Sequence, residues 1–457
     1  MESRTAGSTG RPRTDPRSPR RPVRTWRGWA PVAPGTDQRS TDLRSTDLRS
    51  SALDLDTAFA AVAAGALRDG PVGTVGLELE HHLVDLDRPA ARVPWGRVCG
   101  ALAAVPPLPG GSRVTCEPGG QVELSGPPLP DVVAAVAALR ADRAVVAAVL
   151  AADRLGLAAA GTDPLRPPQR VNPAARYAAM EQHFTAVGCA GAGTAMMTST
   201  ASLQVNLDAG PAAGWGDRVA LAHQLGPVLV AVSACSPLAG GRPTGWRSTR
   251  QQVWGEIDQA RCGPVLRGDD PAGEWAAYAL AAPVMLVRTD DGAEPVRARV
   301  AFSDWVSGEA VLGGRRPTPE DLDYHLTTLF PPVRPRGWLE IRYLDAAPEP
   351  WWPALAAVTT ALLDDPVAAD RAAAASAPTA GAWDRAARAG LTDPALRAAA
   401  RGCLAAAVDA VPAALRPEVE ALAELVERGE DPGTAQLDAL RAGGPAAALL
   451  ATTGGFP

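Results

Sequence analysis

Four parts of the chain alternate polar and apolar residues with a period of two, which is the pattern of β-strands packed on one face only. In residues 76–84, Glu78, Glu80 and His82 fall on one face, while leucines fall on the other. The same alternation recurs further along the chain, in residues 121–125, 201–208 and 338–345. The chain must therefore bury the apolar side of a sheet against helices and keep a polar side.

The polar side of this sheet is rich in carboxylates and amides: Glu78, Glu80, Glu123, Gln204, Asn206, Glu340 and Arg342. Carboxylates one strand-repeat apart repel each other unless positive charge lies between them. A solvated face, or an ordinary ion pair between Glu340 and Arg342, would explain any one strand alone. Four such strands together favour a site for divalent cations. Oxygen ligands suit Mg²⁺ or Mn²⁺ rather than zinc, and carboxylate-bound magnesium usually also carries nucleotide phosphates.

The chain contains no lysine, so all 44 of its basic residues are arginine. Schiff-base enzymes, pyridoxal-phosphate enzymes and P-loop proteins are excluded, because each needs a lysine. Any anionic ligand must be held by arginine, by backbone N–H groups or by metal ions.

The length of 457 residues and the hydrophobic content of 46% allow one large domain or two to three ordinary ones. No apolar run approaches the ~20 residues that a membrane span needs. The six cysteines are scattered without Cys-x-x-Cys spacing. With no secretion signal either, we expect reduced thiols in a cytoplasmic protein that does not bind membranes.

Residues 1–52 are rich in Arg, Ser, Thr and Pro, and they are predicted to form a disordered extension. Residues 1–50 hold 11 arginines against five acidic residues, a net charge of +6. The whole chain carries −6, so the remainder carries −12, which argues against nucleic-acid binding by the folded part. A dispensable extension, a start codon placed too far upstream and a basic tail that touches nucleic acid remain open for this segment.

Helices are predicted between the strands, at 56–68, 131–155, 174–186, 217–234, 247–261 and from Thr318 onward. Asp131 and Thr318 have the residue types of N-caps. The stretch from 187 to 200 is read as a Gly/Ala-rich connection. From about Pro353 onward the chain is predicted to be Ala-rich helix that carries no chemistry.

At its polar strands the sequence resembles the glutamate–cysteine ligases. The segments that carry the resemblance are Gly-Leu-Glu-Leu-Glu at 76–80, Glu-Pro-Gly-Gly-Gln-Val-Glu-Leu-Ser-Gly at 117–126, Gln-Val-Asn-Leu-Asp at 204–208 and Leu-Glu-Ile-Arg at 339–342. Further matches are Ser236-Pro237 with Gly245, Arg250 through Trp254 with Asp258 and Arg261, and residues 325–331. The match is collinear over roughly residues 55–365. It is strongest with the plant and proteobacterial branch and with the bacterial enzymes that open ergothioneine synthesis.

The resemblance implies an α+β, glutamine-synthetase-like fold, in which a curved antiparallel sheet forms a funnel for ATP and two or three Mg²⁺ ions, or Mn²⁺. It assigns metal binding to Glu78, Glu80, Glu123 and Glu340, with Gln204 near the metals. Arg250 and Arg342 are expected to be catalytic contacts to substrate or phosphate. The expected nucleotide contacts are Gln204, Asn206 and Arg250. Plant relatives carry arginine where this chain has Ser199, which leaves an anion contact there unassigned.

The implied reaction is ATP-dependent ligation of the γ-carboxylate of glutamate to cysteine through γ-glutamyl phosphate. Two alternatives stay open from the residues: a related carboxylate–amine ligase with another amine acceptor, and a metal-dependent hydrolase. We expect a catalytic domain at 53–365 and a helical region packed on it at 366–457. The partners are expected to be small molecules, and the sequence leaves the thiol pathway and the oligomeric state open.

Overall fold

A seven-stranded antiparallel sheet organises the residues that this computed structural model describes, which are 53–265, 268–289 and 292–453. The strands follow the order β10-β11-β5-β1-β3-β2, and β4 pairs with the second half of β1. Their bounds are β1 Val75–Asp85, β2 Arg113–Cys116, β3 Val122–Ser125, β4 Leu155–Ala158, β5 Ser202–Asp208, β10 Val333–Pro335 and β11 Trp338–Asp345. The predicted disordered extension, residues 1–52, lies outside the described residues.

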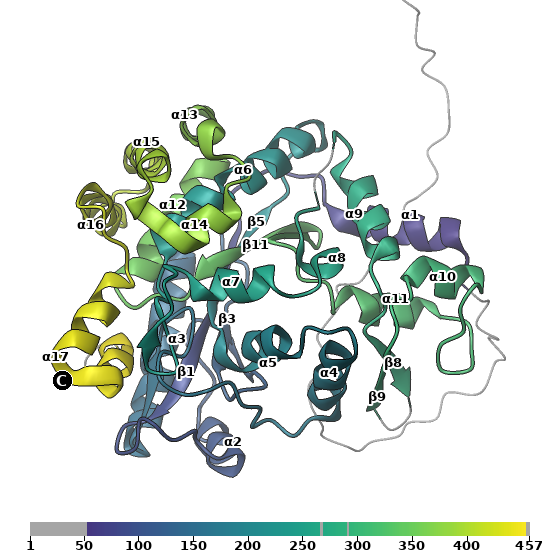
Figure 1. Cartoon of the computed structure of the whole chain (residues 1–457). Helices are drawn as coiled ribbons and strands as arrows, with labels where there is room; N and C mark the ends of the chain where they lie inside the picture. The colour runs from purple at the N-terminus through teal and green to yellow at the C-terminus, as the bar shows by residue number, and fades with distance from the viewer. Residues whose placement is uncertain (1–52, 266–267, 290–291, 454–457) are drawn as a thin grey trace, which may run out of the picture. The chain divides into compact units, whose positions relative to one another are not determined.

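The α-helices of the described residues surround this sheet (Figure 1). Their bounds are α1 Leu55–Ala66, α2 Trp95–Ala103, α3 Val132–Ala152, α4 Ala175–Ala186, α5 Ala190–Ser199, α6 Trp215–Ser233, α7 Thr249–Gly255, α8 Gln259–Cys262, α9 Pro271–Ala281, α10 Phe302–Ser307, α11 Pro319–Leu326, α12 Trp351–Asp364, α13 Pro366–Ser376, α14 Trp383–Ala389, α15 Pro394–Ala410, α16 Arg416–Glu427 and α17 Thr434–Leu450. Two small hairpins complete the list, β6 Leu238–Ala239 with β7 Arg242–Pro243, and β8 Leu286–Thr289 with β9 Gly292–Pro295.

Strand β1 is the centre of the sheet because it pairs with three other strands. Its first half pairs with β5, its middle with β3 and its end with β4, in each case antiparallel. The register sets Glu78 opposite Gln204 and Glu80 opposite Glu123. Because side chains of directly paired residues lie on the same face, this register gathers the predicted polar residues on one side.

The apolar face of the sheet forms the centre of the main core. Its side chains are almost completely buried, among them Leu77, Leu79, Leu203, Val205, Leu207, Leu339 and Ile341. Helices α3, α6 and α12 contact strands of this sheet. Helix α3 begins where it was predicted to begin, because the side chain of Asp131 accepts a hydrogen bond from the backbone N–H of Ala134 at 2.8 Å.

Three predicted connections differ from the structure. Residues 190–199 form helix α5 instead of a loop, because Gly193 lets the helix approach the Phe184 ring more closely than any Cβ would allow. Helix α3, predicted to reach residue 155, ends at Ala152, and Arg154, with a positive φ of 57°, turns the chain into β4. The helix predicted at 247–261 is two short helices, because Asp258 caps a new helix, α8.

The helices after Pro366 lie together in Figure 1, on the opposite side of the view from α9, α10 and α11. Helices α13 to α16 pack on α6 or α12, the helices that cover the apolar face, whereas α17 packs on the short 3-10 helix at Ala451–Thr453. The ring of Trp383 fills the space beside Gly226 and meets the Tyr343 ring edge-on at 5.5 Å between ring centroids. The described residues form one compact unit, and the division at residue 365 stays a prediction about function.

A second, smaller core lies among α4, α5, α8 and β8. It is rich in sulfur, since it contains every methionine after Met1, together with Phe184 and Cys262. Methionine and cysteine side chains fill irregular gaps well. The partly buried rings of Tyr177, Trp254 and Phe330 pack against this core.

In the described residues no helix is both long and apolar enough to cross a membrane. All six cysteines lie in this part of the chain and are free thiols.

We predict that Leu79→Ala lowers the free energy of unfolding by about 2–5 kcal/mol, because the side chain is fully buried in the centre of the sheet. Leu55→Ala is the matched control, since Leu55 is 39% exposed and its loss should change stability by less than about 0.5 kcal/mol. Urea unfolding followed by circular dichroism measures both. Equal changes in the two variants would contradict this packing.

Candidate active site

Strands β1 and β3 place three carboxylates on one face of the sheet. Glu80 lies directly opposite Glu123, and Glu78 lies opposite Ser125. The Ser125 hydroxyl donates a hydrogen bond to the Glu123 carboxylate. All three glutamates are half-buried, so water screens their charges only in part.

Burial and mutual repulsion outweigh the nearby arginines in the acidic half of the face, and the pKa values of its carboxyls show the effect. Burial raises the pKa of Glu78 to about 8, and the charges of Glu123 and Glu340 add to the shift. The pKa of Glu80 is raised for the same reasons, first by burial and then by Glu123. Such carboxyls hold a proton until a cation replaces it.

Glu117 is a further carboxylate of this half, and the sequence analysis did not assign it to the site. Glu117 begins the Pro-Gly-Gly turn, in which its backbone carbonyl accepts a hydrogen bond from the N–H of Gly120 at 2.9 Å. Burial and the charges of Glu123 and Glu80 raise its pKa well above the ordinary value, and it shares a hydrogen bond with Glu123. Its position at the start of a tight turn between two polar-faced strands was the available signal.

Glu340 lies in very different surroundings, because arginines converge on it. Arg334 binds it through both Nε and Nη2, the latter at 2.9 Å, and Arg342 lies 3.3 Å away. Nη1 of Arg336 lies 3.4 Å from Oε1 of Glu340. Burial would raise the pKa of Glu340, but Arg334, Arg342 and Arg336 outweigh burial and hold it below its ordinary value. This half of the face is therefore positively charged.

Arg334 and Arg336 were missed by the sequence analysis. Strand β10 has only three residues and pairs with β11 so that Arg334 lies opposite Glu340. A strand that short, with proline at one end, carries no alternation that could be read from the sequence.

The predicted amides join the two halves. Gln204 donates to Glu80 at 3.2 Å, and its oxygen accepts from Arg342 at 2.6 Å. Asn206 donates to Glu78 at 3.3 Å and accepts from the Trp338 indole at 2.8 Å. Strand β5 thus spaces the carboxylates of β1 from the arginines of β10 and β11.

Arg250 reaches the same region from α7. Its Nη2 donates to the backbone carbonyl of Arg342 at 2.7 Å. The side chain is only 3% exposed, yet among the described residues its Nε and Nη1 atoms have no hydrogen-bond partner. The structure thus brings the predicted residues Arg250 and Arg342 together and leaves two donors of Arg250 available.

Residues 74–448 match the model of the family described as glutamate–cysteine ligase family 2. The chain belongs to this family. The enzyme class implied by the resemblance, a glutamate–cysteine ligase, is thereby confirmed.

Several relatives are similar over most of their length. A protein of Mycolicibacterium smegmatis named glutamate–cysteine ligase EgtA is 60% identical over 86% of this chain and 93% of its own. The protein of that name from Mycobacterium tuberculosis is 54% identical over 87% of this chain and 93% of its own. A chloroplastic glutamate–cysteine ligase of Medicago truncatula is 31% identical over 62% of this chain and 56% of its own.

A solved structure supports the fold of this glutamate–cysteine ligase family member. The crystal structure of Francisella tularensis glutamate–cysteine ligase, in complex with AMP, superimposes with a TM-score of 0.52 and 12% identity. The match covers 84% of this chain and 88% of that chain. The predicted α+β class with an antiparallel sheet is confirmed.

Two residues at the edge of the predicted site are engaged elsewhere. His82 is buried, and its Nε2 lies 3.2 Å from the carbonyl oxygen of Ala160. Ser199 accepts a hydrogen bond from Arg92 at 3.1 Å. The guanidinium of Arg92 therefore lies beside Ser199, the position at which plant relatives carry an arginine of their own.

The donor set of the acidic half suits magnesium. In the described residues no three His, Cys, Asp or Glu side chains lie close enough to hold one ion by themselves. Magnesium does not need such a cage, because it is usually bound by one or two carboxylates together with substrate phosphates and water. Half-buried carboxyls with raised pKa values, such as Glu78 and Glu80, fit this requirement.

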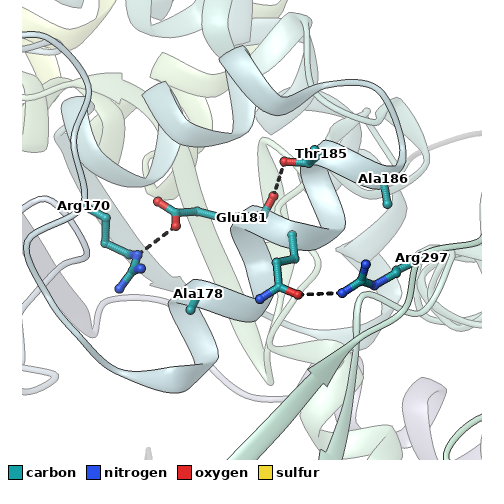
Figure 2. A pocket seen from close by; sticks show the side chains of 7 residues that line it. Arg170, Ala178, Glu181, Thr185, Ala186 and Arg297 are labelled. Carbon is teal, nitrogen blue, oxygen red and sulfur yellow. Dashed lines mark hydrogen bonds and ion pairs between the residues drawn. The ribbon is translucent and has the colours of Figure 1, made fainter.

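A surface hollow with a volume of about 350 Å³ lies on α4, away from the polar face of the sheet. Figure 2 shows the side chains that line it. Its two arginines are already paired, Arg170 with Glu181 at 2.9 Å and Arg297 with Gln182 at 2.9 Å. This hollow is not the candidate active site.

We predict that the stability of the protein freed of divalent ions falls between pH 4.5 and pH 8 through Glu78. The unfolded chain loses this proton near pH 4.5, whereas the folded chain keeps it to about pH 8, so rising pH favours unfolding. Glu78→Gln should therefore raise the melting temperature at pH 8 and leave it unchanged near pH 4. Mg²⁺ should stabilise the wild type more than the variant.

Differential scanning fluorimetry across pH measures this effect. Glu309→Gln, at an exposed glutamate outside the site, is the control and should keep the pH dependence of the wild type. If Glu78→Gln also kept that dependence, Glu78 would not carry the shifted pKa.

Proposed function

We propose that this protein joins the γ-carboxylate of glutamate to the amine of cysteine at the expense of ATP, giving γ-glutamylcysteine, ADP and phosphate. The observation that carries the proposal is the division of one sheet face into an acidic half on β1 and β3 and an arginine half on β10 and β11. A magnesium-bound triphosphate has the same two requirements, carboxylates for the ion and guanidinium groups for the phosphate oxygens.

Glu78, Glu80 and Glu123 would hold two or three Mg²⁺ ions, with Glu117 beside them. Magnesium there would supply positive charge to the phosphoryl oxygens during transfer. Glu340 stands apart, because its own arginines already neutralise it. We propose that its first role is to hold Arg334 and Arg342 in place, and that it contacts an ion as a second role.

The arginine half would act on the transferring phosphoryl group. Arg250 has two buried donors that find no partner in the described part of the chain, and Arg342 is held by Gln204 and Glu340. Donors fixed in advance stabilise charge that develops in the transition state without reorganising. Gln204 and Asn206, between the two halves, are suited to orient the nucleotide.

The reaction needs no protein nucleophile. An oxygen of the glutamate γ-carboxylate attacks the γ-phosphorus, and the bond between that phosphorus and the bridging oxygen breaks to release ADP. The cysteine amine then attacks the acyl carbon, loses a proton and displaces phosphate. Cys116, the thiol beside Glu117, has a pKa that burial raises to about 12, so it stays protonated and takes no part.

The relatives support the finer points of the proposal. Two are named glutamate–cysteine ligase EgtA, which favours cysteine as the acceptor and ergothioneine as the destination of the product. The AMP in the Francisella complex supports an adenine nucleotide as substrate. We place the reaction in the cytoplasm, where the free thiols of the chain stay reduced.

We predict that purified protein releases ADP only when Mg²⁺, ATP, glutamate and cysteine are all present. Coupled ADP detection and product mass spectrometry measure this directly. ADP release with another amine in place of cysteine would point to a different ligase. Metal-dependent turnover without ATP would support the hydrolase instead.

We also predict that Glu78→Gln and Glu340→Gln each lower kcat by at least about 100-fold while the fold is kept, because each removes charge from the transition-state environment. Glu309→Gln is again the control and should retain wild-type rates. Near-normal rates in Glu78→Gln would remove that carboxylate from the site.

A further inference from the structure

Asp345, at the end of β11, joins the polar face through an irregularity in the strand. The pairing of β11 with β5 shifts between Ile341 and Leu344, so that Leu344 faces Leu203 and Asp345 faces Ser202. Simple alternation from Glu340 would have put Asp345 on the apolar side. A β-bulge of this kind re-aims the side chains that follow it.

The Asp345 carboxylate is 1% exposed and collects donors from one segment of chain. Its Oδ2 accepts from the Cys235 N–H at 2.9 Å and from the Ser236 hydroxyl at 2.6 Å. Its Oδ1 accepts from the Ser248 hydroxyl at 2.9 Å. These donors flank the loop that ends in α7, the helix that carries Arg250.

The same contacts fix the backbone of Arg250. The Ser236 oxygen that donates to Asp345 also accepts from the Arg250 N–H at 3.2 Å. Ser248 is the N-cap of α7, and its oxygen accepts from the N–H of Gln251 at 3.2 Å. One carboxylate therefore holds both the serine beneath Arg250 and the cap of its helix.

The carboxylate also balances the charge of Arg250 without occupying its donors. Nη1 of Arg250 lies 4.0 Å from Oδ1 of Asp345, within ion-pair range but beyond a hydrogen bond. Within the described residues, Nε and Nη1 consequently keep no hydrogen-bond partner, which suits them to bind an anion. Gly161 packs directly against Asp345, where a Cβ would overlap the carboxylate, so the position of the aspartate is tightly constrained.

We propose that Asp345 is the positioning residue of this site, which sets the Arg250 guanidinium against the substrate anion through Ser236 and Ser248. The proposal rests on the role of Arg250 in the proposed ligase reaction. It assigns a function to a residue that touches neither the carboxylates of β1 nor, by a hydrogen bond, Arg250 itself.

A double-mutant cycle tests the proposal. Asp345→Asn keeps the shape of the side chain and removes its charge, and Arg250→Ala removes the guanidinium. We expect each to lower kcat/KM by about tenfold or more, and the double variant to match Arg250→Ala within about twofold, because both act through one group. If the losses multiply, Asp345 is merely structural and the proposal is overturned.

Asp142→Asn is the matched control. Asp142 is also fully buried and accepts from a backbone N–H, that of Ser112, at 2.8 Å, but it lies on α3 outside the site. Its effect on kcat/KM should simply multiply with that of Arg250→Ala. If Asp345→Asn does not fold, Ser236→Ala replaces it and should show the same coupling with Arg250→Ala.

The experiment distinguishes failure of the proposed ligase function from failure of the proposed role of Asp345. A wild type without ligase activity would overturn the proposed function, and the cycle would then be scored on the Kd of Mg–ATP by titration calorimetry. Coupling in that Kd would still support Asp345 as the positioning residue, whereas additive losses would overturn it. Unchanged activity in Arg250→Ala would overturn the role of both residues.

Discussion

The site depends on the repulsion between carboxylates that the sheet register forces together. Glu80 lies directly opposite Glu123, and the guanidinium groups beside them are occupied by Glu340 on the far side of β5. Like charges paired across strands cost stability, and burial increases that cost. Burial is the first cause of the raised pKa of Glu78, and the charges of Glu123 and Glu340 add to it. Arg250 and Arg342 offset part of this repulsion at Glu80, and protons or metal ions can relieve the rest.

The rest of the fold holds this unfavourable arrangement in place. The apolar face of the same strands is fully buried against α3, α6 and α12, and each buried leucine there stabilises the sheet by about 1.5–3 kcal/mol. The C-terminal helices also reach the loop beneath Arg250. Asp431 binds Arg247 at 2.7 Å, and Gln436 donates to the Cys235 carbonyl at 2.8 Å. This region thus supports the loop beneath Arg250.

Alternation in the sequence was sufficient to predict the strands and the faces of Glu78, Glu123 and Gln204, because a period of two fixes the side on which each residue lies. It failed where a local irregularity breaks that period. Asp345 follows a bulge, and Glu117 lies in a turn. Helix α5 was missed because its glycines suggest a loop, whereas tertiary packing decides its conformation. Residues that depend on contacts distant in sequence leave no signal in a single chain.

The central claim is that one face of the sheet binds metal ions on β1 and β3 and phosphate on β10 and β11. A crystal structure with Mn²⁺ and a non-hydrolysable ATP analogue tests it most directly, because the anomalous signal of Mn²⁺ locates each ion. The account predicts peaks about 2.0–2.3 Å from the oxygens of Glu78, Glu80 or Glu123, with phosphate oxygens against Arg250 and Arg342. Ions bound elsewhere, or a triphosphate away from these arginines, would contradict it.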